Sequence, residues 1–268
     1  MDLAGKIALV TGASRGIGRA VAVALAEAGV DVACAARATD RAPLSLPGTI
    51  DDTVRAVEAA GRRALAVPTN LADALQVTRM VEATLAHFGR VDILVNNAAI
   101  TFPGDLALPM QRYDLIMAVN LRAPLLATQL VAADMQTRGA GAIVNVSSAA
   151  ALFAVPSLMA YGMSKAALER LTIDCAQQLQ PHGIAVNTFR IDVPVASEGF
   201  VANLPELDTD DWEPTEVPAA GILWMLRQPS AFSGHNLGMV ELRARYGIMA
   251  SRARKPFVMP TDPPRAKG

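Results

Sequence analysis

The chain has 268 residues, a length that fits one large domain, and 52% of them are hydrophobic while 18% are charged. This composition is too apolar for a disordered chain, and 19 glycines are too few for a fibrous one. Because 24 Lys and Arg residues stand against 25 Asp and Glu residues, the formal charge is -1, and no charge field recruits nucleic acid or an anionic membrane. We therefore expect a globular protein without either partner.

The opening of the chain and its cysteines indicate a cytoplasmic protein. Asp2 and Lys6 interrupt the region where a secretory signal needs continuous apolar residues, and no apolar run reaches the roughly 18 residues of a membrane span. Cys34 and Cys175 each lie in an apolar stretch, where a free thiol behaves as a small hydrophobic group. A disulfide framework is therefore excluded, and a reducing compartment is expected.

Short aliphatic runs alternate with Ala-rich stretches of helical period. The expected strands are 6–11, 30–36, 64–68, 91–96, 142–146, 185–189 and 236–240, and the expected helices are 16–29, 49–60, 73–88, about 111–137, 160–179 and 216–227. Strands separated by helices predict βαβ crossovers and a parallel sheet, and strands that are apolar throughout predict helices on both faces. The sequence therefore predicts one α/β domain over residues 1–250, doubly wound around seven parallel strands.

Three segments do not fit this alternation. Residues 37–48 form a loop with two prolines, and residues 192–218 are rich in Pro, Asp and Glu. Loops this long in a compact domain are usually functional, so we expect the second to line a substrate site. Residues 251–268 are basic and Pro-rich, and we expect a terminus that builds no core and either frays or lies against a partner.

A glycine-rich turn follows the first expected strand and opens a helix. Gly12, Gly16 and Gly18 allow the sharp turn and let the backbone approach a pyrophosphate, whose charge the N-H groups of the helix N-terminus meet. An ordinary strand-to-helix turn is the alternative. Because the turn begins a series of βαβ units, we expect a nucleotide site that includes Gly12, Ser14, Arg15, Gly16, Ile17 and Gly18.

The same residues also match the Gly-x-Ser-x-Gly elbow of the α/β-hydrolases, a different reaction class. Ser14 would then be the nucleophile. This interpretation leaves Gly18 without a role, and only one strand precedes the turn, so no earlier loop supplies a second oxyanion donor. The candidate bases would be His87, His182 and His235.

Tyr161 and Lys165 lie four residues apart on an expected helix, which puts both side chains on one face. A cation about 4 Å from a phenol contributes roughly 4 kcal/mol at an effective dielectric of about 20, which is what lowering the phenol pKa from about 10 to about 7 requires. The pair can therefore exchange a proton near neutral pH. A surface contact without consequence is the alternative.

These features occur in an order typical of one family. Asn96-Asn97-Ala98-Ala99 follows the fourth strand, Asn120 lies in the long helix, Ser147-Ser148 closes the fifth strand, and Tyr161-Gly162-Met163-Ser164-Lys165 begins the next helix. With the glycine-rich turn, they make residues 5–242 resemble the short-chain dehydrogenase/reductase family, and residues 46–50 resemble its hydroxysteroid-dehydrogenase-like branch. The resemblance implies a Rossmann-type fold and a homodimer or homotetramer built on the long helices.

The resemblance also implies a catalytic tetrad. Tyr161 would be the general acid/base, Lys165 would hold the nicotinamide ribose and lower the phenol pKa, and Ser148 would polarise the substrate carbonyl. Asn120 would anchor a water that links Lys165 to solvent, with a purely structural contact as the alternative. Because side chains alternate along a strand, Ser147 faces away, and we expect Ser148 to act.

The end of the second strand indicates NADP(H) rather than NAD. NAD-specific relatives place an acidic residue there to bind the ribose hydroxyls, whereas this chain has Ala36 followed by Arg37, with Arg15 in the glycine-rich turn. Two guanidiniums can hold a 2'-phosphate bidentately, and two solvated surface arginines are the alternative. Further cofactor contacts are implied at Asn70, Leu71, Asn97 and Ala98.

The adenosine end departs from the family pattern at two positions. Asn70 stands where an aspartate usually contacts the adenine amino group, although an amide oxygen can accept the same bond. Ala99 replaces the last glycine of the Asn-Asn-Ala-Gly turn and so narrows the space near the adenosine ribose.

The nicotinamide end departs as well, because residues 190–194 replace the usual Pro-Gly after the sixth strand. Proline has no N-H to give, so we expect a one-residue insertion that places Val195 and Ser197 on the nicotinamide carboxamide. Asp192 would lie near the pyrophosphate with Arg190 neutralising it. The alternative is a disordered lid in which both charges face water.

The sequence therefore predicts an NADP(H)-dependent oxidoreductase without a metal site. It would transfer a hydride between the cofactor and a small carbonyl or secondary alcohol substrate. The alternative is a nucleotide-binding sensor that keeps the fold without turnover, although a sensor has no use for a tuned phenol.

Overall fold

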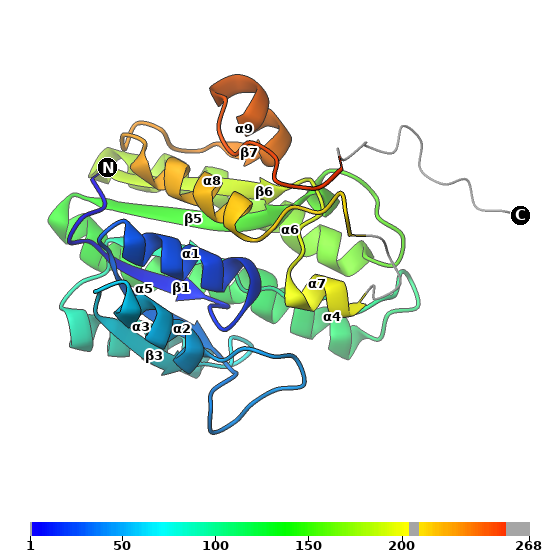
Figure 1. The fold of residues 1–268 in the computed structure, drawn as a ribbon, viewed down its shortest axis with the longest axis horizontal. Helices are drawn as coiled ribbons and strands as arrows, with labels where there is room; N and C mark the ends of the chain where they lie inside the picture. The colour runs from blue at the N-terminus through cyan, green and yellow to red at the C-terminus, as the bar shows by residue number, and fades with distance from the viewer. Residues whose placement is uncertain (1, 204–208, 256–268) are drawn as a thin grey trace, which may run out of the picture.

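The computed structural model describes residues 2–203 and 209–255, and its centre is a seven-stranded sheet (Figure 1). The strand order is β3-β2-β1-β4-β5-β6-β7, and every pairing is parallel. The predicted doubly wound α/β fold is confirmed. The strands are β1 (Ile7–Thr11), β2 (Asp31–Ala36), β3 (Ala64–Pro68), β4 (Ile93–Asn96), β5 (Gly141–Ser148), β6 (Ile184–Ile191) and β7 (Asn236–Gly238).

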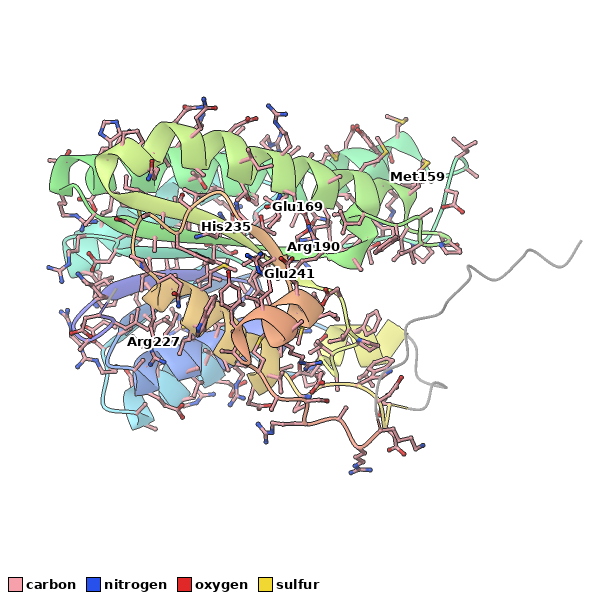
Figure 2. All side chains as sticks on the ribbon, turned by 90° about the horizontal axis from the view of Figure 1, so that it is seen from above. Met159, Glu169, Arg190, Arg227, His235 and Glu241 are labelled. Carbon is pink, nitrogen blue, oxygen red and sulfur yellow. The ribbon has the colours of Figure 1, made fainter. Side chains whose placement is uncertain are left out.

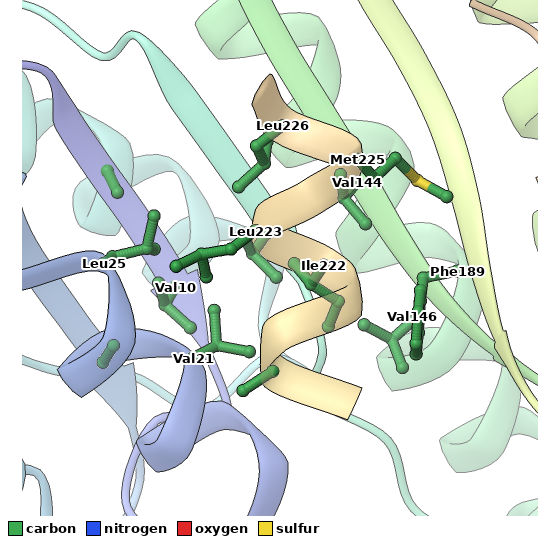
Figure 3. Close-up of a cluster of buried hydrophobic side chains, with 14 of the residues drawn as sticks. Val10, Val21, Leu25, Val144, Val146, Phe189, Ile222, Leu223, Met225 and Leu226 are labelled. Atoms are coloured by element: carbon green, nitrogen blue, oxygen red, sulfur yellow. The ribbon is translucent and has the colours of Figure 1, made fainter. Parts of the chain in front are cut away.

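Helices cover both faces of the sheet, as strands that are apolar on both sides require. On one face, α1 and α8 pack on each other over the sheet through Val21, Leu25 and Ile222 (Figure 3). A second cluster fills the space between the other face and α3, α5 and α6. The helices named here are α1 (Gly16–Glu27), α2 (Ile50–Ala59), α3 (Ala74–Phe88), α5 (Ala123–Arg138), α6 (Met159–Leu179) and α8 (Glu216–Arg227).

The structure differs from the predicted elements in three places. The expected helix over 111–137 consists of α4 (Met110–Met117), a π-helical turn η1 (Ala118–Arg122) and α5. The predicted loop 192–218 contains a short helix, α7 (Glu198–Asn203). The last strand ends at Gly238, where the unpredicted helix α9 (Met239–Tyr246) begins. Short 3-10 turns, η2 (Ala149–Ala151) and η3 (Gln180–His182), follow β5 and α6.

Glu213 connects the segment before α8 to the chain after β6 and to the C-terminal segment. Its backbone forms a parallel bridge with Val195. Its buried carboxylate accepts hydrogen bonds from Arg243 Nη2 (2.7 Å), Ser251 Oγ (2.5 Å) and the Arg252 N-H (2.8 Å). The start of the predicted frayed tail is therefore anchored, while residues 256–268 of that tail and 204–208 of the predicted substrate loop lie outside the described residues.

A row of polar side chains crosses four strands beneath α6. Asn96, Asn145, Thr188 and Asn236 occupy one register position on β4, β5, β6 and β7. Asn96 Nδ2 donates to Asn145 Oδ1 at 2.9 Å. Asn145 Nδ2 and Thr188 Oγ1 both donate to Thr172 Oγ1 on α6, at 2.9 and 2.7 Å. These bonds satisfy polar groups that would otherwise be costly inside the core.

One helical stretch has the length and composition of a membrane span. Residues 110–138 contain a window with a mean hydropathy of 1.5, and 50% of that window is buried inside the fold. Within this stretch α5 packs against α3 and α6. The stretch therefore contributes to the core between the sheet and its helices.

Candidate active site

The glycine-rich turn between β1 and α1 is shaped by contacts that leave no room for side chains. A Cβ on Gly18 would collide with the Gly12 carbonyl oxygen, and a Cβ on Gly12, whose φ is +67°, would lie 2.9 Å from Ala98 Cα. Among the described residues, no side chain caps α1 and no acidic residue lies in its first turn. The N-H groups at the N-terminus of α1 therefore have no side-chain acceptor and can bind a phosphate.

The end of β4 supports this turn directly. Thr11 Oγ1 accepts hydrogen bonds from the N-H groups of Asn97 (3.1 Å) and Ala98 (3.2 Å). Asn97 Nδ2 donates to the carbonyls of Thr11 (2.9 Å) and Gly12 (3.3 Å). Two of the predicted cofactor contacts, Asn97 and Ala98, thus lie against the turn itself. The remaining predicted members of the turn, Ser14 and Ile17, are buried and half-buried respectively.

Two arginines flank the turn. Arg15 Nη2 donates to the Gly48 carbonyl at 3.1 Å, which joins the 37–48 loop to the turn. Burial lowers the pKa of Arg15, Glu198 on α7 raises it and Arg37 lowers it, so the two guanidiniums are close enough to interact. Arg37 is exposed directly after Ala36. The structure therefore brings the two predicted arginines together, and it adds Glu198, which sequence reasoning missed.

Asn70 and Leu71 follow β3 at the same edge of the sheet. Asn70 is exposed, and its Oδ1 accepts a hydrogen bond from the Ala72 N-H at 3.2 Å. Leu71 is buried in the core between the sheet and α3. The amide oxygen expected to accept from adenine is therefore already engaged in a local turn, which leaves one lone pair for a ligand.

Tyr161 and Lys165, on the first turns of α6, meet the carboxyl end of β5. The Tyr161 phenol lies within hydrogen-bonding reach of the Ser148 side chain, which lowers the phenol pKa. Lys165 Nζ donates to the Val146 carbonyl at 2.7 Å and lies 5.6 Å from the centroid of the Tyr161 ring. Ser147 is buried, and its Oγ has no hydrogen-bond partner in the described part of the chain. The structure therefore brings Ser148, rather than Ser147, to the phenol.

Burial controls the ionisation of the Tyr161 and Lys165 side chains. Burial raises the pKa of Tyr161, and the hydrogen bond with Ser148 opposes this effect. Burial lowers the pKa of Lys165 to about 8, against the attraction of Glu169. The expected net depression of the phenol pKa is not seen in this structure, because burial of the phenol outweighs the effects that lower its pKa. Tyr161 is consequently protonated at neutral pH and can donate a proton.

Asn120 is fully buried in η1, and π-helical turns occur frequently at functional sites. Its Oδ1 accepts from the Ile100 N-H (2.9 Å), and its Nδ2 donates to the Ile100 carbonyl (2.9 Å) and to Ser164 Oγ (3.0 Å). Ser164 Oγ in turn donates to the Tyr161 carbonyl at 2.7 Å. The Asn120 side chain therefore joins the loop after β4 to α6, which favours the structural alternative for this side chain.

The end of β6 differs from the prediction. Arg190 binds both carboxylate oxygens of Glu169 on α6, at 2.8 and 2.6 Å, and does not pair directly with Asp192. Asp192 lies against Gly238, where a Cβ would collide with its carboxylate, and it accepts from the Val240 N-H at 3.2 Å. It therefore caps α9 near the β7 edge, with β4 and β5 separating it from the glycine-rich turn. Burial raises the pKa of Asp192 overall, while the charge of Arg190 still lowers it, as the predicted neutralisation requires. The placement of Asp192 and the hydrogen-bonded partner of Arg190 were not predicted because both depend on elements distant in the sequence.

Val195 and Ser197 continue the chain from β6 toward the glycine-rich turn. Val195 is buried in the core and its backbone pairs with Glu213. A Cβ on Gly16, whose φ is +55°, would lie 3.2 Å from the Cβ of Ser197. Ser197 thus lies beside the glycine-rich turn, while the Val195 side chain is held in the core.

The hydrolase interpretation fails on geometry. Ser14 follows the carboxyl end of β1. The three histidines instead precede strands, so they lie at the amino ends of the strands, on the opposite side of the sheet from Ser14. They are His87 near the end of α3, His182 in η3 and His235 just before β7. A cavity of about 290 Å³ also lies on that opposite side, among Lys6, Gly141 and Gly183. Neither the histidines nor this cavity belongs to the site around Tyr161.

Comparison with known proteins identifies the family. Residues 6–193 match the family model described as short chain dehydrogenase. The chain belongs to the short-chain dehydrogenase family. One relative of this short-chain dehydrogenase is hydroxysteroid dehydrogenase-like protein 2 of Danio rerio, which is 32% identical over 249 residues. The match covers 92% of this chain and 60% of that relative.

Solved structures share the fold. A protein from Beutenbergia cavernae, provisionally assigned as an NAD(P)-dependent gluconate 5-dehydrogenase and holding NADP at low occupancy, has a TM-score of 0.78, with 28% identity over 88% of this chain and 96% of that one. A short chain dehydrogenase of Mycobacterium paratuberculosis bound to NAD has a TM-score of 0.75, with 26% identity over 89% of this chain and 97% of that one. The family match ends at residue 193, within the 190–194 segment that departs from the family pattern.

Proposed function

We propose that this short-chain dehydrogenase transfers a hydride between NADP(H) and a carbonyl or secondary alcohol, with Tyr161 as the general acid/base. The observation that carries the proposal is the convergence of Tyr161, Ser148 and Lys165 at the carboxyl end of β5. In open α/β sheets ligands bind outside the carboxyl ends of the strands, which is where the glycine-rich turn also lies. The fold and the chemistry of these side chains therefore point to one site.

The residues of the turn fit a dinucleotide. The backbone around Gly12 and Gly18 excludes side chains, and the N-terminus of α1 is without a side-chain cap among the described residues. A pyrophosphate would accept hydrogen bonds from these backbone N-H groups. When bound, the nicotinamide group supplies or accepts the hydride.

The proton chemistry belongs to the chain's own side chains. Ser148 and Tyr161 are adjacent donors, and together they can bind a carbonyl oxygen on which negative charge develops during reduction. The raised pKa of Tyr161 keeps its proton available at neutral pH, and the phenol O-H passes that proton to the oxygen. The Lys165 ammonium then stabilises the phenolate that remains. Asn120 supports this arrangement by holding α6 against the loop after β4.

Arg15 and Arg37 support a preference for NADP(H) over NAD. Ala36 offers no carboxylate to bind ribose hydroxyls or to repel a 2'-phosphate, and the two guanidiniums interact electrostatically at this position. Glu198 lies close enough to raise the pKa of Arg15, so it balances part of this positive charge when the phosphate is absent. One solved relative holds NADP and another holds NAD, so relatives do not decide between the two cofactors. The preference for NADP(H) is therefore tested by changing residues of this chain.

For the nicotinamide end we propose the one-residue insertion, with Ser197 in the place of the family's threonine. Ser197 lies beside Gly16 at the turn, and Pro194, which has no N-H, uses its carbonyl to accept from the Glu213 N-H at 2.9 Å. The N-H of Val195 would be the second donor to the carboxamide.

Two titrations and one variant test the function. NADPH and NADH are titrated by fluorescence, and a panel of aldehydes and ketones is then assayed with the tighter cofactor. Tyr161→Phe is expected to abolish turnover while cofactor affinity stays within a few fold, because only the proton donor is lost. Tyr246→Phe, which removes a phenol on the exposed helix α9, is the matched control. Cofactor binding without any turnover in the unmodified protein would instead establish the sensor alternative.

We also propose a cytoplasmic homo-oligomer formed by residues 1–250 through α5 and α6. Leu125, Met163 and Ile173 on these helices are exposed apolar side chains, which oligomer interfaces commonly bury. Both cysteines are free, as a reducing compartment requires. Light scattering after size exclusion measures the assembly, and a monomer would overturn this part of the proposal.

A further inference from the structure

Arg190 and Glu169 form a buried ion pair beneath the first half of α6 (Figure 2). Their side chains are only 10% and 8% exposed, and the pair is bidentate, at 2.8 and 2.6 Å. A bidentate pair of Arg and a carboxylate is the strongest and most directional of side-chain ion pairs. Arg190 lies near the end of β6, in the 190–194 segment where this chain departs from its family, and no step described above uses it.

The pair lies one helical turn from Lys165. Glu169 follows Lys165 by four residues on α6, so the carboxylate and the ammonium lie on the same face of the helix. Arg190 is the register partner of Ser147 on β5, which is next to the Val146 carbonyl that binds Lys165 Nζ. Ser147 Oγ is buried there without a partner among the described residues. The carboxylate of Glu169 is thus bound by Arg190 and also attracts the Lys165 ammonium.

Removing the guanidinium would leave a buried carboxylate without its partner, which is a costly state. The cation that acts on Glu169 would then be the Lys165 ammonium, one turn away on α6. An ion pair between Lys165 and Glu169 would draw the ammonium away from Val146 and from the phenol of Tyr161. Arg190 prevents this rearrangement by occupying both carboxylate oxygens.

Apart from Arg190, no charged group near Lys165 in the described part of the chain binds Glu169. On α6 the ionisable neighbours are Tyr161 and Glu169, and on β6 the neighbour is Arg190. Asp192 and Glu241 also act electrostatically on Arg190. In the described part of the chain, β5 and η1 contribute uncharged groups to this surrounding, namely Ser147, Ser148 and Asn120.

We propose that Arg190 is a positioning residue for Lys165: by holding Glu169 in a bidentate pair, it keeps the Lys165 ammonium on the Val146 carbonyl and available to the catalytic phenol and the cofactor ribose. The inference rests on the proposed function for its catalytic consequence, but the ion-pair arrangement can be measured independently of activity. Glu169 raises the pKa of the Lys165 ammonium, and Arg190 holds the Glu169 carboxylate in place.

The decisive measurement is the titration of Lys165 by NMR in protein labelled with 13C lysine, which is practicable because the chain has 4 lysines. Arg190→Met leaves Glu169 free to attract the ammonium, so the titration midpoint of Lys165 is expected to rise. Glu169→Gln removes that attraction and leaves Arg190 nearby, so the midpoint is expected to fall. One unit charge at this spacing changes the ratio of ammonium to amine about tenfold. Signals are assigned by comparison with Lys165→Met.

A matched control and a double variant distinguish a role of Arg190 in positioning Lys165 from a role in stabilising the fold alone. Arg170→Met removes an exposed arginine that pairs with Asp174 on the same helix, and it should leave the Lys165 midpoint unchanged. Combining Arg190→Met with Glu169→Gln removes both charges and should return the midpoint toward that of the unmodified protein. Should Arg190→Met not fold, Glu169→Gln still tests the inference through its predicted downward shift. Midpoints that stay unchanged in Glu169→Gln, or that move in the same direction in both single variants, would overturn the inference.

Activity provides the second readout. In Arg190→Met, kcat is expected to fall by up to about 100-fold, since displacing a group by about 1 Å can cost that much, and the double variant should recover most of the loss. A structural role would lower the melting temperature in all three variants without this recovery. If the midpoints move as predicted but the unmodified protein reduces no carbonyl, the positioning inference stands and the catalytic proposal fails. If the protein reduces a carbonyl but the Lys165 midpoints do not move, the catalytic proposal stands and the positioning inference fails.

Discussion

The buried carboxylate of Glu213 offers a direct test of how the chain after β6 is held. Glu213→Gln keeps the size of the side chain but removes its charge. Three hydrogen bonds are affected, from Arg243, Ser251 and Arg252, at 2.7, 2.5 and 2.8 Å. Each loses about 1 kcal/mol when a charged acceptor becomes neutral, for a total of about 3 kcal/mol. Because Arg243 retains 24% exposure and can turn to water, we expect a net loss of about 2 kcal/mol in the free energy of unfolding.

This loss corresponds to a decrease of roughly 4–8 °C in melting temperature for a chain of this size. Urea denaturation followed by circular dichroism measures the free energy directly. Glu216→Gln, at an exposed position in the first turn of α8, is the matched control and should change stability by less than about 0.5 kcal/mol. Equal effects of the two substitutions would refute the assignment of Glu213 as an anchor.

The stability difference between the unmodified protein and Glu213→Gln should depend on pH, which further tests the role of the Glu213 charge. Burial raises the pKa of Glu213, but hydrogen bonds from Ser251 and Arg252 and the charge of Arg243 lower it more, so the folded-state pKa lies below 4.5. A group whose folded-state pKa is depressed stabilises the fold above its unfolded-state pKa and loses that effect as the pH falls. The stability difference between the unmodified protein and Glu213→Gln should therefore be full at neutral pH and shrink as the pH drops below about 4.5. A difference that stays constant down to acid pH would contradict the charge argument.

Three further outcomes are expected. Ser148→Ala should lower kcat roughly 100-fold, the effect of removing one oriented donor from a developing oxyanion, whereas Ser147→Ala should change it by no more than a few fold; the reverse result would show that the other serine contacts the substrate. Gly18→Ala should abolish cofactor binding, measured by fluorescence titration, because the new Cβ collides with the backbone of the glycine-rich turn; near-normal affinity would show that the turn relaxes. NADPH should bind at least about tenfold more tightly than NADH, and Ala36→Asp combined with Arg37→Ala should reverse the order, while equal affinities in the unmodified protein would disprove the arginine clamp.

Local patterns in the sequence sufficed for the sheet and for much of the site. Strand and helix periodicity predicted seven parallel strands, and Ser148, the serine expected to act, is the one that affects the phenol pKa. The alternation of side chains does not explain this choice, because Ser147 lies two residues after Asn145, which bonds to Thr172 on α6, and so shares that face of β5. The strand-to-helix junctions were predictable because glycine, proline and helix-capping residues act within a few positions. Thr49, whose side chain accepts from the Asp52 N-H at the start of α2, is one such local signal.

The errors concern interactions between segments distant in the sequence. Arg190 was expected to neutralise its neighbour Asp192, but its partner is Glu169, 21 positions away on a different element. Helix α9 was missed because its eight residues follow β7 without a turn signal, and its start depends on the Asp192 carboxylate from the preceding crossover. The direction of the phenol pKa shift was mispredicted because spacing along a helix does not reveal how strongly burial raises the pKa of Tyr161.

The polar row across β4, β5, β6 and β7 has a consequence for how the sheet assembles. Strands that are apolar on both faces carry no pattern that distinguishes one alignment of neighbouring strands from an alignment shifted along the chain. A shift of β5 against β4 would separate Asn96 from Asn145 and leave the Asn145 amide oxygen without its donor in a dry interior. A single buried amide pair thus makes misaligned sheets costly, and it does so at the end of β4 next to the glycine-rich turn, where an error in alignment would displace the cofactor site.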